Sequence, residues 1–476
     1  MTEKPLTDSN GRAAGKRGGK ASGASRKTAQ KQRYRRLPKG THGLDPELVK
    51  HDQRERLRTA MVELIAAKGY PAVRISDLSK LAHVSPPTLY SLYGDKEELF
   101  LGTYEDIAQR TASVVLGAYD VEGSPEQRLP AAMRAFAELA ASEPQSISLL
   151  ALGAFGAGPK VLERRRETLR RLEQGIQSSR DRGAGDTAGD LTVKSILGGI
   201  REVASSRLRD GREHELPELS DALASWAASY PRRLPRGLAP APDACPERRA
   251  SSREASPRAR RARGALPSGP SDMPRQFIVK SQRERIVDAT AAIVAEKGLA
   301  GLTIPEIARR ANVSNQTFYA IYPSKNDAFL GAQKIGLHQA LRVSVEAYDA
   351  EMPDWPQAIA AGLRALLDYL ASEPAHAHLA LVDTFAVSPQ AIKIRSVTMQ
   401  GFGLYLRPGH DLAAGPRAVP AIVAEAVVGG IWQILHHYVE SDSIDRLPGA
   451  APQLIYFALA PFLGPEEAAA AALRSE

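Results

Sequence analysis

Two short stretches of the chain place small polar and amide side chains at regular intervals among apolar ones. The later stretch, Ser314 to Leu330, reads SNQTFYAIYPSKNDAFL, and the earlier one, Ser85 to Leu101, reads SPPTLYSLYGDKEELFL. In a helix, Phe318, Ile321 and Tyr322 fall at i, i+3 and i+4 on one inward face, which leaves the polar residues outward. Amide groups can pair with adenine, and methyl groups can contact thymine. The outward face therefore has the chemistry of a surface that reads base pairs in a major groove.

The residues before the later stretch predict how this surface is positioned. Thr303 is a good helix N-cap, and Pro305 suits a first turn, so a short helix is expected up to Ala311. Asn312 tolerates the left-handed backbone that a tight turn requires, and Ser314 can cap the next helix. The spacing predicts a helix-turn-helix in which the second helix enters the groove.

The earlier stretch repeats the pattern with other side chains. Arg74 stands where the later copy has Thr303, and His83 occupies the turn position. Ser85 can cap the helix, and Pro86 and Pro87 fit its first turn because no hydrogen bond is lost there. We expect base contacts from the outward side chains and phosphate contacts from the lysines and tyrosines. The candidate DNA contacts are Arg74, Ser85, Pro86, Pro87, Thr88, Tyr90, Ser91, Tyr93, Lys96, Thr303, Ser314, Asn315, Gln316, Thr317, Tyr319, Ala320, Tyr322 and Lys325.

Both stretches resemble the DNA-binding domain of TetR/AcrR-family transcriptional regulators. The resemblance rests on a first helix that ends in glycine, at Gly69 and Gly298, on the helix-turn-helix, and on the endings YSLYGDK and YAIYPSK. The chain departs from the family at the turn, which lacks a glycine in both copies, and at Arg74. The resemblance implies double-stranded DNA as a partner, a C-terminal helical domain for dimerisation, an unknown small-molecule effector and no cofactor.

The similarity between the copies continues far beyond these stretches. ASEP at 141–144 returns at 371–374, and GGI at 198–200 returns at 429–431. A match of this length indicates a duplicated domain pair. We predict an all-α fold of two tandem TetR-like units. The expected segments are a disordered basic tail (1–45), DNA-binding domain 1 (46–102), regulatory domain 1 (103–231), a Pro/Arg-rich linker (232–275), DNA-binding domain 2 (276–331), regulatory domain 2 (332–465) and a C-terminal tail (466–476). The first repeat is 46–231 and the second is 276–465.

Charge separates the expected flexible segments from the compact ones. Residues 1–43 carry a net charge of +10 and residues 232–275 carry +7, within a total of +9. Basic arms of this kind either touch nucleic acid or merely aid solubility. A single cysteine, Cys245, the absence of a secretory signal and the absence of a run of 18 apolar residues favour a cytoplasmic protein without membrane spans.

Two identical reading helices normally come from two chains, but this chain carries both. We expect the last long helices of each repeat, about 190–208 and 217–230 with about 417–440 and 451–463, to pair as an intramolecular pseudo-dimer. Gly429 and Gly430 would permit close approach. Because the two reading helices differ, the DNA site would be asymmetric. A dimer of two whole chains is the alternative arrangement.

The regulatory domain of the second repeat is the richer in aromatic residues. The candidate ligand-binding residues are Tyr369, Phe385, Phe402, Tyr405 and Trp432, although such residues are more often core. The histidine pairs 376/378 and 436/437 lack metal-ligand spacing, so no metal is expected. The sequence also lacks a catalytic constellation. The function classes that remain are a DNA-binding regulator, most often a repressor in this family, and a ligand-binding or interaction protein whose helix-turn-helix units no longer bind DNA.

Overall fold

The fold is taken from a computed structural model, which describes residues 45–121, 125–153, 158–181, 191–231, 233–239, 241–242, 274–381, 388–413 and 418–474. Within these ranges the secondary structure is helical and no strand occurs, so the all-α prediction is confirmed. The chain divides into two compact units, Met1–Thr103 and Tyr104–Glu476. Among the helices described, none has the length and apolarity needed to cross a bilayer.

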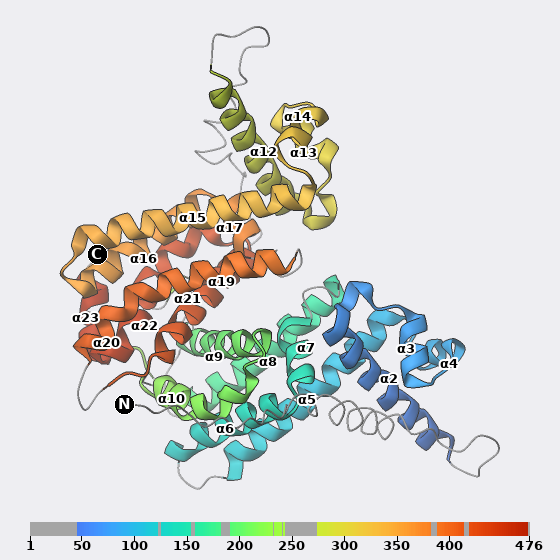
Figure 1. The fold of residues 1–476 in the computed structure, drawn as a ribbon. Helices are drawn as coiled ribbons and strands as arrows, with labels where there is room; N and C mark the ends of the chain where they lie inside the picture. Colours follow the sequence, from blue (N-terminus) through green and yellow to red (C-terminus); the bar gives the residue numbers. More distant parts are fainter. Residues whose placement is uncertain are drawn as a thin grey trace, which may run out of the picture. The chain divides into compact units, whose positions relative to one another are not determined.

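The described part of the first unit is a small bundle that ends in the first turns of a long helix (Figure 1). Its elements are α2 (Pro46–Lys68), η1 (Tyr70–Ala72), α3 (Ile75–Ala82), α4 (Pro86–Leu92) and the start of α5 (Lys96–Val121). Helix α2 ends because Gly69 adopts a φ of 75°, which a side chain would disfavour. Leu57, Met61 and Leu89 are fully buried, so the apolar faces of the three helices form one core.

The second repeat begins with the same bundle and continues into a larger helical domain. Its elements are α12 (Arg275–Lys297), η4 (Leu299–Gly301), α13 (Ile304–Ala311), α14 (Asn315–Ile321), α15 (Lys325–Glu351), α16 (Trp355–Ser372), α17 (Pro374–Leu381), α19 (Pro389–Gly403), η5 (Leu404–Leu406), α20 (Arg407–Leu412), α21 (Ile422–Glu440), η6 (Ile444–Ala450), α22 (Ala451–Leu463) and α23 (Pro465–Arg474). Helices α12 and α17 pack together, so the bundle is joined to this larger domain by a shared core.

The first regulatory region has fewer described elements. They are the remainder of α5, α6 (Pro125–Ser142), α7 (Pro144–Leu152), α8 (Pro159–Asp181), α9 (Thr192–Arg209), η3 (Glu213–Glu215) and α10 (Leu216–Ala228). Helix α6 packs on α10, and α7 and α8 both contact α9.

Helices α9 and α21 pair along their length and join the regulatory regions of the two repeats (Figure 1). The approach is close because glycines face each other: a Cβ on Gly199 would lie 2.2 Å from the Ala426 carbonyl oxygen, and one on Gly430 would lie 2.5 Å from that of Ser195. Helices α9 and α21, two of the long helices expected to pair, therefore pack on each other within one chain. The pseudo-dimer on DNA stays a prediction. We call this α9–α21 contact the seam.

Two segments differ from the sequence prediction. The expected C-terminal tail forms helix α23, whose Ala468 and Ala472 are fully buried against the rest of the second repeat. The beginning of the expected linker packs on the second repeat, because Tyr438 donates a hydrogen bond to the carbonyl of Pro242 and Gln453 donates one to that of Ala239. The basic tail, residues 1–44, and the rest of the linker up to 273 lie outside the described residues.

Candidate nucleic-acid interface and ligand pocket

The first reading head, α2 to α4, and the second, α12 to α14, share an arginine that holds the turn between the last two helices. Arg56 is buried and Arg285 is half-buried. Nη1 of Arg56 donates to the carbonyls of Ala82 and His83, at 2.8 and 3.3 Å. Arg285, 229 residues later, donates to the carbonyls of the corresponding turn, at 3.0 Å each. These carbonyls stand at the ends of helices α3 and α13, where main-chain acceptors have no partner within the helix. The arginines therefore fix the angle at which each reading helix leaves its turn.

The turn itself has the predicted geometry in both heads. His83 has φ 54° and Asn312 has φ 50°, so both residues are left-handed. After the turn, Ser85 accepts a hydrogen bond from the Thr88 N–H at 3.3 Å, and Ser314 accepts one from the Thr317 N–H at 3.0 Å. These N-caps begin α4 and α14 as the sequence predicted.

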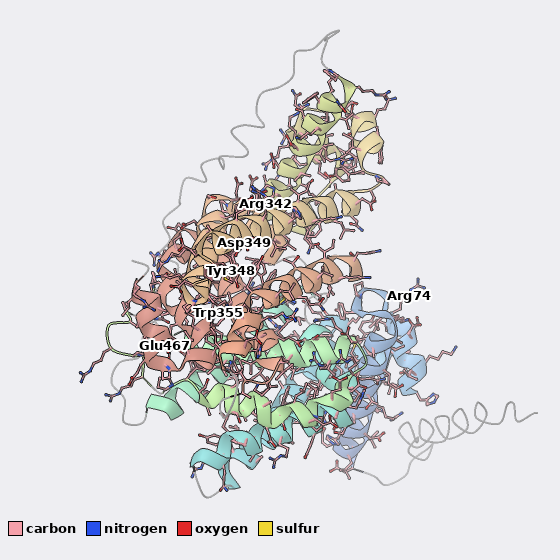
Figure 2. All side chains as sticks on the ribbon, turned by 60° about the vertical axis from the view of Figure 1, so that its left-hand side comes forward. Arg74, Arg342, Tyr348, Asp349, Trp355 and Glu467 are labelled. Atoms are coloured by element: carbon pink, nitrogen blue, oxygen red, sulfur yellow. The ribbon has the colours of Figure 1, made fainter. Side chains whose placement is uncertain are left out.

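The reading helices bury their apolar face and leave the polar face open. Leu89 and Phe318 are fully buried, whereas Tyr90 is 51% exposed and Tyr319 is 56% exposed. Thr88 and Thr317 are half-buried because they pair with the capping serines. The predicted contacts that are exposed are Arg74, Ser85, Pro86, Pro87, Tyr90, Ser91, Thr303, Ser314, Asn315, Gln316, Tyr319 and Ala320. Figure 2 shows Arg74 at the surface of the first unit.

The lysines and inner tyrosines, which the sequence predicted as phosphate contacts, contact groups of their own reading head. Lys96 donates to the carbonyls of Tyr70 and Val73, and its ammonium lies 4.1 Å from the Tyr70 ring centroid. Lys325 donates to the Leu302 carbonyl at 2.9 Å. These donors stabilise the start of the long helix that follows each reading helix. Both lysines thus donate to main-chain carbonyls of their own reading head, and Lys325 remains exposed. Their phosphate contacts stay predictions.

Tyr93 and Tyr322 also contact groups of their own reading heads. The Tyr93 hydroxyl accepts a hydrogen bond from Arg58 Nε at 3.1 Å, and Tyr322 is only 9% exposed. The Tyr322 ring lies over Gly331, where a Cβ would approach its hydroxyl to 2.7 Å. These rings pack each reading helix against the following helix, at Gly102 and Gly331. Their contacts with DNA stay predictions.

A second contact recurs in both heads and was missed by sequence reasoning. The lysine that ends the first helix pairs with an acid in the next one: Lys68 with Asp77 at 2.5 Å, and Lys297 with Glu306 at 3.1 Å. Hydrogen bonds from Arg309 and then from Lys297 lower the pKa of Glu306 to about 2. The sequence signal that could have predicted this contact is that both members of the pair recur 229 residues later.

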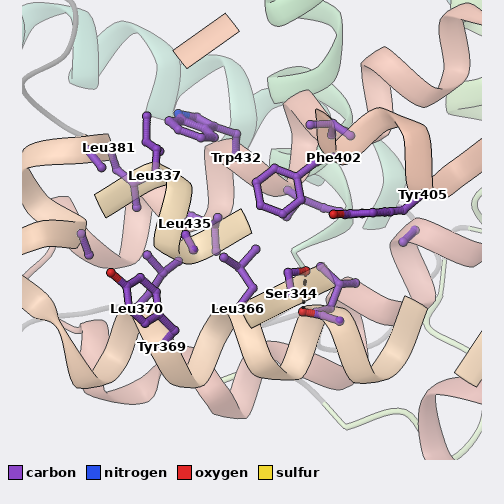
Figure 3. A pocket seen from close by; sticks show the side chains of 18 of the residues that line it. Leu337, Ser344, Leu366, Tyr369, Leu370, Leu381, Phe402, Tyr405, Trp432 and Leu435 are labelled. Carbon is purple, nitrogen blue, oxygen red and sulfur yellow. Dashed lines mark hydrogen bonds between the residues drawn. The ribbon is translucent and has the colours of Figure 1, made fainter. Parts of the chain in front are cut away.

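Four of the five predicted ligand-binding residues come together. Tyr369, Phe402, Tyr405 and Trp432 line one cavity in the second repeat, between α15, α16, α19 and α21 (Figure 3). Phe385 lies outside the described residues. The cavity is small, about 70 Å³, and its walls are almost entirely hydrocarbon. It can accept an apolar group but has few partners for a charged one.

Some of the polar groups at this cavity are hydrogen-bonded within the protein and others are not. Ser344 donates to the Gly362 carbonyl at 2.9 Å, and burial raises the pKa of Tyr405 to about 12, so its hydroxyl stays neutral. The indole Nε1 of Trp432 is buried and has no hydrogen-bond partner among the described residues. A ligand oxygen would gain a new hydrogen bond from this donor. The ring nitrogens of His376, which also lines the cavity, likewise have no hydrogen-bond partner among the described residues.

The cavity also touches the second reading head through one histidine. His376 on α17 lines the cavity, is 4% exposed, and places Nε2 3.5 Å from Asp288 Oδ1 on α12. A ligand that displaces α17 would therefore act on the first helix of the second head. Over the described ranges, no group of three His, Cys, Asp or Glu side chains is placed to hold a metal ion.

Comparison with known proteins identifies the two heads independently. The family described as bacterial regulatory proteins, tetR family, matches residues 57–103 and 286–331. The HTH-type transcriptional activator FasR of Mycolicibacterium smegmatis is 28% identical over 134 residues, which cover 28% of this chain. That match spans 61% of the relative's length, so less than two-thirds of it.

Solved structures of similar proteins match at low sequence identity. The fatty acid degradation regulator FadR of Bacillus halodurans is 16% identical with a TM-score of 0.34, and the match covers 37% of this chain and 94% of that protein. FadR of Bacillus subtilis, solved in complex with stearoyl-CoA, is 19% identical with a TM-score of 0.33, and the match covers 36% of this chain and 96% of that protein.

Proposed function

Since this chain belongs to the TetR family of bacterial regulatory proteins and carries the family's DNA-binding segment twice, we propose that a single chain binds one operator as an intramolecular pseudo-dimer. Each reading head would enter one of two successive major grooves, about 34 Å apart. The protein is a transcriptional regulator. Its partner is double-stranded DNA, so its place of action is the bacterial cytoplasm.

The observation that carries this proposal is the seam. Helix α9 of the first repeat and α21 of the second pair closely enough that glycines are required at the contact. Arg207 crosses the seam with Nη1 2.9 Å from both carboxylate oxygens of Glu425. A homodimer would form such a contact between two chains, whereas here both halves belong to one chain.

The operator of such a pseudo-dimer is asymmetric. The outward residues of α4 and α14 are identical at Thr88/Thr317 and Tyr90/Tyr319. They differ where Asn315 and Gln316 replace prolines and where Ala320 replaces Ser91. An amide side chain can pair with adenine, but a proline cannot, so the second half-site carries the stronger base preference.

We further propose that a small apolar molecule binds the cavity of the second repeat and changes DNA affinity. The support is the set of aromatic and aliphatic side chains lining it and the free indole N–H of Trp432. Typical ligand sites enclose about 300–1,000 Å³, so binding must spread the helices around this 70 Å³ cavity. We propose that the protein represses transcription by occupying its operator. Because the relative FasR is named an activator, a reporter assay decides whether binding lowers or raises transcription.

In vitro selection of DNA with the full chain tests this function. The expected result is one chain per DNA by light scattering, on a site with two different half-sites about 10 base pairs apart. Two chains per site would favour the dimer of whole chains. Failure to enrich any sequence, despite normal folding, would contradict the proposal and favour an interaction module with inactive reading heads.

A further inference from the structure

A buried contact connects the cavity of the second repeat with the first repeat. The Arg395 guanidinium carbon lies 4.6 Å from the ring centroid of Trp432, which lines the cavity. Arg395 also donates two hydrogen bonds to Glu202 on α9, Nη1 to Oε1 at 2.9 Å and Nη2 to Oε2 at 2.8 Å. Arg395 is 3% exposed and Trp432 is 7% exposed, so both contacts are shielded from water. One side chain thus touches the cavity wall and the other repeat at once.

The surroundings of Glu202 make this contact stiff. Burial alone would raise the pKa of Glu202, but Arg395 and Arg209 hold it near 2, so the carboxylate stays charged. Glu202 also lies where α9 and α21 approach closely, because a Cβ on Gly429 would lie 2.5 Å from the Glu202 Cβ. The planar guanidinium of Arg395 makes both hydrogen bonds to Glu202 in one plane. A tilt of the guanidinium must therefore break one of these hydrogen bonds or move α9.

The described residues of the first repeat do not form the reciprocal connection at the matching positions. The residues after the repeated GGI are Arg201 and Glu202 in the first repeat and Trp432 and Gln433 in the second. The first repeat therefore has the guanidinium of Arg201 where the second has the indole of Trp432. The second repeat has the amide of Gln433 where the first has the carboxylate of Glu202. Arg201 donates to Gln433 instead. Among the described residues, an ion pair anchored to an aromatic cavity wall runs from the second repeat to the first, and no counterpart runs the other way.

From this asymmetry we infer that one effector molecule, bound in the second repeat, controls both halves of the pseudo-dimer, and that Trp432, Arg395 and Glu202 carry the signal to the first. The inference rests on the proposed effector cavity. A ligand that expands the cavity displaces the Trp432 ring, the stacked guanidinium follows, and the paired carboxylate moves α9. Arg395 is a positioning residue in this scheme, because it faces the ring of Trp432 and not the cavity.

The test uses the full chain and N-phenyl-1-naphthylamine, an uncharged apolar fluorophore, as the probe. Fluorescence titration gives its affinity, and hydrogen exchange of residues 192–209 reports α9. With the unaltered protein, a saturating probe is expected to change exchange in α9 by about five-fold or more, the lower end of allosteric couplings. In Glu202→Gln the probe should bind within about three-fold of the original affinity, but the change in α9 should fall below about two-fold.

Two further variants separate signalling from stability. Glu425→Gln makes the same chemical change at the Arg207–Glu425 ion pair of the seam, which does not touch the cavity, and should keep the response. Arg395→Glu combined with Glu202→Arg restores an ion pair between α19 and α9 but removes the cation from the Trp432 ring. This double variant should regain the unfolding midpoint that Glu202→Gln loses and still show no response in α9.

Each outcome decides between the alternatives. A normal response in Glu202→Gln would overturn the inference, because α9 would then respond without this ion pair. An equal loss of response in Glu425→Gln would also overturn it, because the coupling would then depend on inter-repeat contacts in general. Probe binding without any change in α9 of the unaltered protein would overturn it and leave the effector cavity standing. No probe binding would refute the apolar cavity itself, and with it this inference, while operator binding would still test the DNA-binding function.

Discussion

The hydroxyl of Tyr230, at the end of the first repeat, donates a hydrogen bond to the Phe457 carbonyl of the second at 2.9 Å, and the two rings stack with centroids 4.9 Å apart. Trp226 donates to the same hydroxyl at 3.1 Å. Tyr230→Phe would leave the indole N–H and the carbonyl buried without partners. We expect a loss of about 1–3 kcal/mol in the free energy of unfolding. Denaturant titration measures it, and an unchanged midpoint would show that the repeats do not depend on this contact.

Glycine spacing at the seam gives a second prediction. A Cβ on Gly199 would meet backbone atoms of Ala426, so Gly199→Ala must push α9 and α21 apart. Such overpacking should destabilise the protein by about 1–3 kcal/mol. Gly175 lies on an exposed part of α8 with no heavy atom near its Cβ position. Gly175→Ala should therefore stabilise the protein by up to about 1 kcal/mol, because alanine favours the helix. Equal effects of the two substitutions would argue against the close contact.

The turn of each reading head depends on its arginine. Arg285→Met removes the donor for the carbonyls of Ala311 and Asn312. We expect faster hydrogen exchange in residues 304–321, corresponding to a local loss of about 1 kcal/mol or more. Arg309→Met, in the same head, removes only a surface ion pair with Glu306 and should change stability by less than about 0.5 kcal/mol. If Arg309→Met had the larger effect, the role assigned to Arg285 would be wrong.

These reading heads show what the sequence could reveal. Their helices, caps and left-handed turn residues follow from local preferences at Ser85, Asn312 and Ser314, and the repeat supplied a second copy of each. The direction of a long side chain does not follow from its type. Lys96 and Lys325 could reach either a phosphate or a main-chain carbonyl, and the structure places them on carbonyls.

Long-range contacts were harder to predict than local ones. The glycines at 429 and 430 indicated close helix packing, and the aromatic residues indicated a cavity, because both signals lie within single helices. Helix α23 was missed because its buried face is alanine, which gives little apolar contrast in the sequence. The pairing of Arg395 with Glu202 joins residues 193 positions apart, and no spacing rule connects them.

Acid should weaken the protein through His436. Burial, together with the charges of Arg165, Arg201 and Arg395, lowers the pKa of His436 to about 4 from its ordinary 6.5. The His436 imidazole therefore binds a proton more readily in the unfolded chain than in the folded one. The neutral, buried imidazole is fully tolerated above pH 6.5, and the free energy of unfolding falls as the pH drops toward 4. Between pH 6.5 and 5 we expect a loss of about 2 kcal/mol that His436→Gln abolishes. An identical pH slope in the variant would contradict this.

The central claim is that one chain reads one site with two different helices, and converting one helix into the other tests it most directly. The outward residues of α4 become those of α14 with only Pro86→Asn, Pro87→Gln and Ser91→Ala, because Thr88 and Tyr90 already match. In vitro selection of DNA should yield an asymmetric site for the original chain and a palindromic site, still bound by one chain, for the triple variant. The same preferred site for both proteins, or a palindromic site for the original chain, would contradict the account.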